Sequence, residues 1–226
     1  MATTPTPLFL LFDMDGTLTD SNPTHKEAYT QFFARYDIEL TDDDFKEQIS
    51  GKMNPEIMTY FFKEKKGEKL SKERLDELTR EKEALYQDLF APKIKPIKGL
   101  HEFLMAVEAA KFPMALATSA PMINVDFVFE KLGIRQFFQE IVTDKDVEKG
   151  KPEPDVFRVA AERLGAKPDQ CIVFEDSAKG VESAKKAKMV VVCLTVSHEP
   201  EATEQADRVI DDYTQIRVDE LAGMVG

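Results

Sequence analysis

The feature that most constrains this chain is an apolar run, Leu8–Phe12, that leads directly into the acidic sequence DMDG at residues 13–16. An unbroken apolar run of this kind is typical of a strand buried on both faces, as in a parallel sheet. Gly16 then predicts a sharp turn that ends the strand. In open α/β sheets, ligands bind beyond the carboxyl ends of the strands. We therefore expect Asp13 and Asp15 to lie in a functional site, although a simple polar turn would explain these two residues alone.

Two carboxylates that lie close together at the end of a buried strand need a compensating positive charge, because buried like charges repel. Hard carboxylate oxygens suit Mg²⁺. The sequence therefore predicts a magnesium site, with Asp13 as a metal ligand and candidate nucleophile. Asp15, two residues later, is in a position to hold or deliver a proton.

The remaining chain consists of one long helical block followed by alternating helices and strands. Residues 21–93 are rich in Lys and Glu and have apolar residues at helical spacing. Further strand patterns lie at 112–120, 138–143, 171–176, 189–194 and 208–210. This alternation predicts right-handed crossovers and a mostly parallel sheet. We expect an α/β fold in which residues 1–18 and 95–226 form a Rossmann-like core. Residues 19–94 would form an inserted α-helical cap that can close over the site.

Composition narrows the class of protein further. The 226 residues carry a net charge of −12, which argues against binding to nucleic acid or to an anionic membrane surface. No apolar run approaches the roughly 20 residues that span a bilayer, and no basic region precedes the N-terminal apolar stretch. We therefore expect a cytoplasmic monomer that acts on a small molecule, with Cys171 and Cys193 as buried free thiols.

Four groups of polar residues follow successive predicted strands. They are Asp13 with Asp15, Thr118 with Ser119, Lys151, and Glu175 with Asp176. Parallel strands point their carboxyl ends the same way, so we expect the four groups to form one site. A phosphoryl group is dianionic and needs cations and hydrogen-bond donors around its oxygens. Lys151, Thr118 and Mg²⁺ would supply these, which would let Asp13 attack phosphorus while Asp15 transfers the proton.

These groups, in this order, resemble the motifs of the haloacid dehalogenase-like hydrolase superfamily, in the branch with a helical cap between the first two motifs. They stand here as DMDGTLTD at 13–20, Thr118 in ATSAP, Lys151 in GKPEPDVF, and Glu175-Asp176 in FEDSAKGVESA. The resemblance implies Asp13 as nucleophile and Asp15 as general acid and base. It also implies Mg²⁺ on Asp13, the Asp15 carbonyl and Asp176, with Glu175 as a further ligand or as a support for the ligands. The aspartate two residues after the nucleophile is typical of members that act on phosphate esters.

Within this superfamily the chain is most similar to β-phosphoglucomutase and the sugar phosphatases. His25, in HKEAY, matches a histidine that contacts the acid/base aspartate when the cap closes; a surface histidine is the alternative. The loop SGKMNPEIM at 50–58 resembles the specificity loop, with Asn54 where the mutase has an arginine. An asparagine cannot hold a second phosphate as arginine does, and Lys52 would compensate only in part. The resemblance implies substrate contacts from His25, Gly51, Lys52, Asn54, Ser119, Ala120 and Asn124.

We therefore predict a magnesium-dependent phosphatase that hydrolyses a small phosphate monoester, a sugar phosphate in particular, through an aspartyl-phosphate intermediate. A mutase of the β-phosphoglucomutase type is the alternative. A non-catalytic binding protein on the same fold is a third hypothesis, because fold does not determine function. Every catalytic position is filled, which favours an enzyme.

Overall fold

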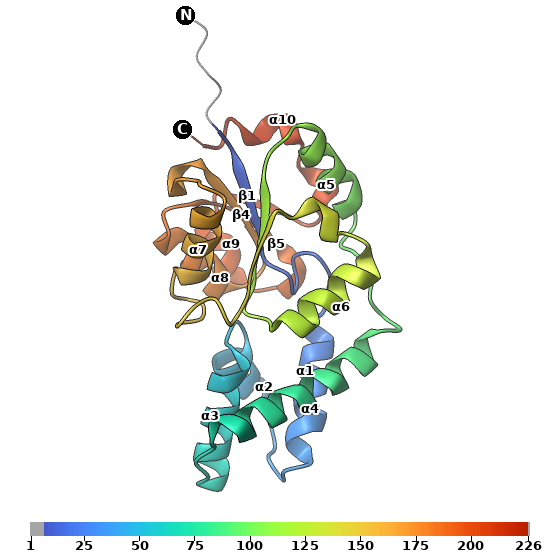
Figure 1. Cartoon of the computed structure of the whole chain (residues 1–226), viewed down its shortest axis with the longest axis vertical. Coiled ribbons are helices and arrows are strands. Elements are labelled where there is room, and N and C mark those ends of the chain that lie inside the picture. Colours follow the sequence, from blue (N-terminus) through green and yellow to red (C-terminus); the bar gives the residue numbers. More distant parts are fainter. Residues whose placement is uncertain (1–6, 226) are drawn as a thin grey trace, which may run out of the picture.

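A six-stranded parallel sheet forms the centre of the protein, as a computed structural model of residues 7–225 shows (Figure 1). Residues 1–6, the start of the expected core segment, lie outside this range. The strands are β1 (Phe9–Phe12), β2 (Met114–Ala117), β3 (Glu140–Val142), β4 (Cys171–Glu175), β5 (Val190–Leu194) and β6 (Arg208–Ile210). Their order is β3-β2-β1-β4-β5-β6, and every neighbouring pair is parallel. The predicted parallel sheet is confirmed, and β1 lies near its middle.

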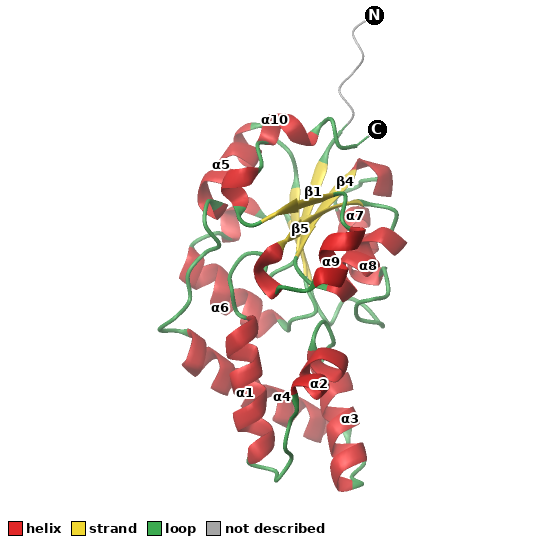
Figure 2. Ribbon diagram, turned by 180° about the vertical axis from the view of Figure 1, so that it is seen from behind, coloured by secondary structure: helices red, strands yellow, loops and turns green. Residues whose placement is uncertain are grey.

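Helices cover both faces of the sheet (Figure 2). One face carries α5 (Leu100–Ala109), α6 (Met122–Leu132) and α10 (Val218–Leu221), and the other carries α7 (Asp155–Arg163), α8 (Ala178–Lys186) and α9 (Pro200–Gln205). Side chains of β1 alternate between the two apolar layers, as the strand period requires: Leu10 and Phe12 face one layer and Leu11 the other. The central strand is therefore buried on both faces, as its unbroken apolar sequence predicts.

The sequence of residues 214–222 is typical of a helix, but the structure is only partly helical there. A 3₁₀ turn, Tyr213–Gln215, is followed by Ile216 in an extended conformation and then by the four residues of α10. Ile216 and Tyr213 are both buried against the core. The extended residue allows both side chains to reach that layer, and this burial overrides the helical pattern.

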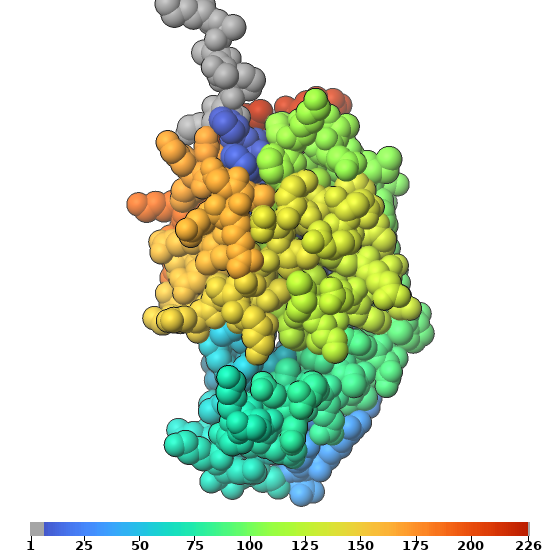
Figure 3. Space-filling model, viewed as in Figure 1, coloured from blue at the N-terminus to red at the C-terminus, as the bar shows by residue number. Residues whose placement is uncertain are grey.

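A separate group of helices lies at one end of the molecule. It contains α1 (Asn22–Ala34), α2 (Asp42–Asp44), a π-helical turn (Phe45–Ile49), α3 (Asn54–Lys66) and α4 (Lys72–Phe90). These helices share their own apolar cluster, and five of its ten buried side chains are aromatic. Thr41 caps α2 through a capping box and Ser71 caps α4. The cap helices touch the core along the boundary seen in Figure 3. The exact boundaries at residues 18 and 95 remain predictions.

The two connections between core and cap run side by side. Thr19 and Pro96 form an isolated β-bridge, and the Thr19 hydroxyl donates a hydrogen bond to the Lys95 carbonyl at 2.7 Å. The Ile97 amide donates to the Leu18 carbonyl at 2.9 Å. Both connections therefore leave the core at one place, next to the turn that follows Asp13.

Two further expectations concern the cysteines and membrane segments. Cys171 and Cys193 are free and buried. Among residues 7–225, no helix has the length and apolar character that a membrane crossing requires.

Candidate active site

The strand register brings the predicted site residues to one edge of the sheet. Phe12 pairs with Phe174 on β4, and their rings stack with centroids 4.7 Å apart. The ladder continues for one residue past each strand. The Asp13 amide donates to the Phe174 carbonyl at 3.0 Å, and the Thr118 amide donates to the Val142 carbonyl at 3.0 Å. Asp13 therefore lies between the ends of its two neighbouring strands.

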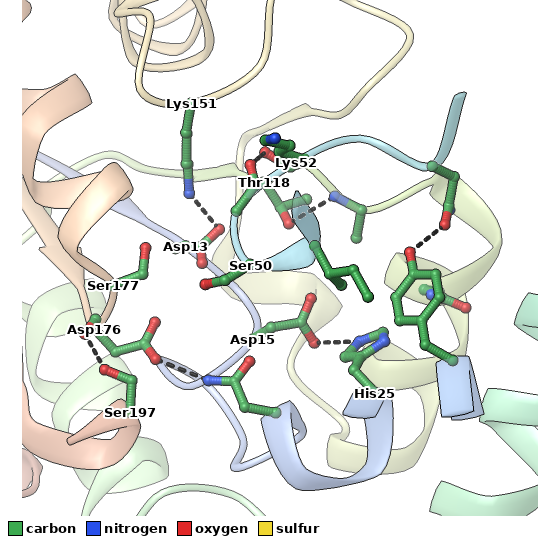
Figure 4. Close-up of a pocket in the computed structure, with 18 of the residues that line it drawn as sticks. Asp13, Asp15, His25, Ser50, Lys52, Thr118, Lys151, Asp176, Ser177 and Ser197 are labelled. Atoms are coloured by element: carbon green, nitrogen blue, oxygen red, sulfur yellow. Dashed lines mark hydrogen bonds and ion pairs between the residues drawn. The ribbon is translucent and has the colours of Figure 1, made fainter. Parts of the chain in front are cut away.

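A cavity of about 170 Å³ lies between this sheet edge and the cap (Figure 4). Every predicted site residue except Glu175 lines it, namely Asp13, Asp15, His25, Gly51, Lys52, Asn54, Thr118, Ser119, Ala120, Asn124, Lys151 and Asp176. The close-up shows Asp13 beside Lys151 and Asp15 beside His25, around one open space. Residues from both the core and the cap thus surround the candidate nucleophile.

Lys151 links two carboxylates at the base of the cavity. Its ammonium lies 2.7 Å from Asp13 Oδ1 and 2.7 Å from Glu175 Oε1, and the residue is only 4% exposed. Burial, opposed by Lys151 and reinforced by Glu175 and Asp15, raises the pKa of Asp13 to about 7. A single lysine therefore does not fully offset the negative charge that is buried here.

Glu175 lies behind the wall of the cavity and is completely buried. Its Oε2 accepts hydrogen bonds from the Asp176 amide at 2.6 Å, the Ser177 amide at 2.7 Å and the Ser177 hydroxyl at 3.1 Å. Its other oxygen contacts Lys151. This arrangement fixes both the lysine and the loop that carries Asp176. Whether Glu175 is itself a metal ligand remains a prediction.

A donor set for a divalent cation exists beside Asp13. Asp13, Glu175 and Asp176 each offer one carboxylate oxygen, and these oxygens lie within 4.8 Å of one another. Burial and the charges of Glu175 and Asp13 raise the pKa of Asp176 well above its usual range. Three buried carboxylates against one lysine leave a deficit of positive charge, and their hard oxygen donors fit Mg²⁺. Asn22 also donates to Asp176 Oδ2, at 2.9 Å.

Gly16 lets the turn after β1 pass close to Asp176. Its φ is +76°, in the left-handed region, and a Cβ at this position would lie 1.9 Å from Asp176 Oδ2. A side chain here would therefore collide with a predicted metal ligand. The DMDG turn therefore packs directly against Asp176, and position 16 has no room for a larger residue.

Different partners hold Asp15. The Ser21 hydroxyl donates to its Oδ1 at 2.5 Å, and His25 Nε2 lies 3.2 Å from the same oxygen. The His25 ring stacks on Tyr86 of α4 with centroids 3.9 Å apart. Burial alone would raise the pKa of Asp15, but His25 and the Ser21 hydrogen bond bring it below its usual value. The two aspartates of DMDG therefore occupy electrostatically different environments.

Several residues that line the cavity are absent from the sequence prediction, most notably Lys82 and Glu83 on α4, which are each 1% exposed. The pattern could have indicated Lys82. Leu78, Tyr86 and Phe90 are buried at intervals of four and eight residues, and Lys82 fills the gap. Periodicity treats a charged residue as solvent-facing, so it does not find a buried lysine.

Comparisons with known proteins agree with this geometry. Residues 10–194 match the family model described as haloacid dehalogenase-like hydrolase. A validoxylamine A 7'-phosphate phosphatase from Streptomyces hygroscopicus subsp. limoneus is 31% identical over 207 residues, covering 92% of this chain and 94% of that protein. A fructose-1-phosphate phosphatase from Escherichia coli K12 is 31% identical over 185 residues, covering 81% and 94%.

Solved structures share the whole architecture. A β-phosphoglucomutase from Clostridium difficile superposes with a TM-score of 0.82 at 24% identity, covering 96% of each chain. A CbbY protein from Rhodobacter sphaeroides, a mutant in complex with xylulose 1,5-bisphosphate, gives 0.81 at 24% identity, covering 94% of this chain and 97% of that one. At this level of identity the two structures establish a common fold.

Proposed function

Because this chain belongs to the haloacid dehalogenase-like hydrolases, we propose that it is a phosphatase that hydrolyses small phosphate monoesters, sugar phosphates in particular, through a phosphorylated Asp13. The observation that carries the proposal is that two aspartates with different partners line the same cavity. Asp13 contacts Lys151 at 2.7 Å, and Asp15 contacts Ser21 and His25. One carboxylate faces a cation that can also hold a phosphoryl oxygen, and the other is held ready to move a proton.

The residues of this chain would divide the reaction into two steps. In the first, an Asp13 oxygen attacks phosphorus, the bond to the ester oxygen breaks, and protonated Asp15 donates its proton to the leaving oxygen. In the second, Asp15 removes a proton from water, the water oxygen attacks phosphorus, and the bond to Asp13 breaks. Lys151 and the Thr118 hydroxyl would stabilise the negative charge of the transferring group.

We place Mg²⁺ on Asp13, the Asp15 carbonyl and Asp176, with Glu175 supporting the site. The deficit of positive charge among the three buried carboxylates supports this assignment. The bound cation would supply positive charge that lets an anionic nucleophile approach an anionic substrate.

The names of the two curated relatives support a phosphorylated sugar or a similar polyhydroxylated compound as the substrate. The cavity wall also supports it, since Asn54 and Asn124 provide neutral polar groups there. The mutase remains the alternative. It differs in requiring a bisphosphate activator and in returning the phosphoryl group to sugar rather than to water.

A phosphate-release assay tests the proposal. The purified chain is incubated with hexose, pentose and polyol phosphates, nucleotides, phosphoglycolate and p-nitrophenyl phosphate, with Mg²⁺ or with EDTA. We expect Mg²⁺-dependent release, fastest from one class of sugar phosphate. Asp13→Asn should abolish it, while Asp88→Asn, an exposed change on α4, should not.

Two results would overturn the proposal. One is turnover by Asp13→Asn near that of the unsubstituted protein. The other is conversion of β-glucose 1-phosphate to glucose 6-phosphate, dependent on added bisphosphate, without free phosphate. Release from none of these esters would instead favour a non-catalytic protein.

A further inference from the structure

A cluster of buried polar residues lies on the cavity wall, away from the reacting aspartates. It consists of Lys82 and Glu83 of α4, Asn54 at the start of α3, and Asn124 of α6. All four line the cavity and none is more than 4% exposed. Asn124 belongs to the core and the others to the cap, so the cluster spans the boundary between them. The two-step reaction above uses none of the four.

Glu83 is the centre of this cluster. Its Oε1 lies 2.6 Å from the Lys82 ammonium and accepts a hydrogen bond from the Asn54 amide at 2.6 Å. Its Oε2 accepts from the Asn124 amide at 2.7 Å. The Tyr29 hydroxyl in turn donates to the Asn54 carbonyl oxygen at 2.6 Å. The carboxylate is therefore held in one orientation by groups from three helices.

The charges of this wall cancel. A buried lysine without a partner would attract an anionic part of a substrate, but Lys82 is already paired with Glu83. Burial would raise the pKa of Glu83, yet Lys82 and the other neighbours lower it, so the carboxylate stays charged. A second phosphate or a carboxylate at this wall would meet the repulsion of Glu83 and would have to compete with it for Lys82.

The wall suits hydroxyl groups instead. Within residues 7–225, Glu83 is the one ion-pair partner of the Lys82 ammonium, which also lies over the rings of Tyr29, at 4.2 Å, and Tyr86, at 5.8 Å. The Asn54 amide uses one of its two N–H groups. Spare N–H donors therefore lie beside a carboxylate with further lone pairs. A hydroxyl group both donates and accepts, so a polyol can satisfy both kinds of group at once.

From this arrangement we propose that Glu83 is a specificity-determining residue that selects monophosphates of uncharged polyols and rejects esters with a second anionic group. The inference rests on the proposed phosphatase function and extends it to the part of the substrate that does not react. Glu83 acts by neutralising Lys82, so the selection is against a charge as well as for hydroxyl groups.

Lys52 is a second cation on the same cavity, and its ammonium is 2.8 Å from Gln48 Oε1. If it captured a second phosphate, the selection argued here would fail. A single lysine holds a phosphate less well than an arginine, because it lacks the two parallel donors. Lys52 therefore offers a distinct alternative that the same experiment can test.

Competition against p-nitrophenyl phosphate hydrolysis tests the inference with a matched pair of compounds, fructose 1-phosphate and fructose 1,6-bisphosphate. The readout is the ratio of their two inhibition constants on each variant, so a change in turnover cancels. For the unsubstituted protein we expect the monophosphate to bind at least about tenfold more tightly, because like charges in an interface disfavour the wrong partner. In Glu83→Gln the ratio should fall about tenfold or more, because Lys82 becomes an unpaired cation.

A double variant separates charge from structure. Lys82→Gln combined with Glu83→Gln keeps the wall neutral, so the preference for the monophosphate should return. If Glu83 only supported the local structure, replacing its partner as well should disturb binding further. If Glu83→Gln does not fold, Lys82→Gln alone tests the same idea, because it leaves the Glu83 carboxylate unpaired. The preference for the monophosphate over the bisphosphate should then increase. Glu77→Gln, an exposed change on α4, should leave the ratio unchanged.

Equal binding of the two fructose phosphates to the unsubstituted protein would overturn the inference, as would binding of neither or an unchanged ratio in Glu83→Gln. Loss of bisphosphate binding in Lys52→Gln would assign the second phosphate to Lys52 and would also overturn it. All these results leave the phosphatase proposal intact, provided that p-nitrophenyl phosphate is hydrolysed. Absence of that hydrolysis would count against the proposed function itself.

Discussion

Asp13 and Asp15 have the same side chain but are held for different tasks. Lys151 and the neighbouring carboxylates surround Asp13, whereas a hydroxyl and an imidazole hold Asp15. A carboxylate can serve as a nucleophile only if it is ionised and as an acid only if it carries a proton. In the metal-free protein the pKa of Asp13 is raised and that of Asp15 is lowered, so the proposed roles require a bound cation to keep Asp13 ionised and require Asp15 to take up a proton against the effect of His25.

The role proposed for Asp15 predicts an effect that depends on the leaving group. Asp15→Asn should lower kcat/KM about 10³-fold for a sugar phosphate, whose alkoxide leaving group needs a proton. The loss should be much smaller for p-nitrophenyl phosphate, because nitrophenolate leaves without one. Steady-state kinetics on both esters would measure this difference. Equal losses on the two substrates would contradict the role of general acid.

Gly16 predicts an effect on the metal site through crowding. Gly16→Ala should displace Asp176, because the new Cβ would lie 1.9 Å from Asp176 Oδ2. We expect the apparent Mg²⁺ affinity to fall at least tenfold, as measured by Mg²⁺ titration of activity and of thermal stability. Gly67→Ala is the matched control, since its φ of +66° is similar and nothing lies within 4 Å of its Cβ position. Both variants should lose about 1 kcal/mol from the left-handed conformation, and only Gly16→Ala should also lose metal affinity.

At the scale of elements, α8 of the core holds the cap through one side chain. The Lys179 ammonium donates hydrogen bonds to the carbonyls of Ser50 at 2.8 Å, Glu47 at 3.3 Å and Lys46 at 3.5 Å, near the end of the π-helical turn. These carbonyls have no partner further along the helix, so a cation there is favourable. The Ser119 hydroxyl makes a second contact of this kind, with the Gly51 carbonyl at 3.3 Å.

Lys179→Met should therefore weaken closure of the cap without unfolding the core. Hydrogen bonds to a charged group contribute about 1.5–3 kcal/mol, so we expect KM for the sugar phosphate to rise about tenfold. Amide hydrogen exchange should quicken in residues 45–52. Lys186→Met, an exposed change on the same helix whose partners Glu153 and Glu182 both belong to the core, should alter neither quantity. Unchanged exchange in Lys179→Met would contradict a closing role for this contact.

The sequence was a better guide to the core elements than to the cap. The strands and the polar residues that follow them could be predicted, because unbroken apolar runs mark buried parallel strands. On α4 the apolar periodicity of the sequence marks Leu75, Leu78, Leu85 and Leu89, but the structure buries Leu78, Lys82, Glu83, Tyr86 and Phe90. A paired lysine and glutamate can be buried because each neutralises the other. Their partners Asn54 and Asn124 lie on other helices, so the local sequence pattern of α4 could not predict these contacts.

At the scale of the whole molecule, buried negative charge couples folding to pH and to metal. In metal-free protein the folded state keeps the Asp13 proton up to about pH 7, whereas the unfolded chain releases it near pH 3.8. The folded state thus binds more protons between these values, so this contribution to stability is full below pH 3.8 and is lost as the pH rises to 7. A tenfold difference in proton affinity between the two states corresponds to about 1.4 kcal/mol.

Asp13→Asn should remove this dependence. In EDTA, the free energy of unfolding of the variant minus that of the unsubstituted protein should increase steadily between pH 4 and 7, as measured by urea unfolding. Mg²⁺ should stabilise the unsubstituted protein more than the variant at pH 7, because a ligand that binds only the folded state adds to its stability. The free energy of unfolding of Asp88→Asn should change with pH in the same way as that of the unsubstituted protein. Parallel curves for Asp13→Asn would contradict the raised pKa of Asp13.

The paired connections at Thr19 and Pro96 bear on how such a protein can diversify. Because the inserted segment enters and leaves the core at adjacent positions, its removal or replacement need not disturb the order or register of the six strands. A lineage could therefore exchange, lengthen or shorten the segment between Thr19 and Pro96 while inheriting the same aspartates, lysine and threonine unchanged. The fold thus keeps most of the residues that we propose select a substrate apart from those that we propose transform it, with Ser119, Ala120 and Asn124 of the core as exceptions.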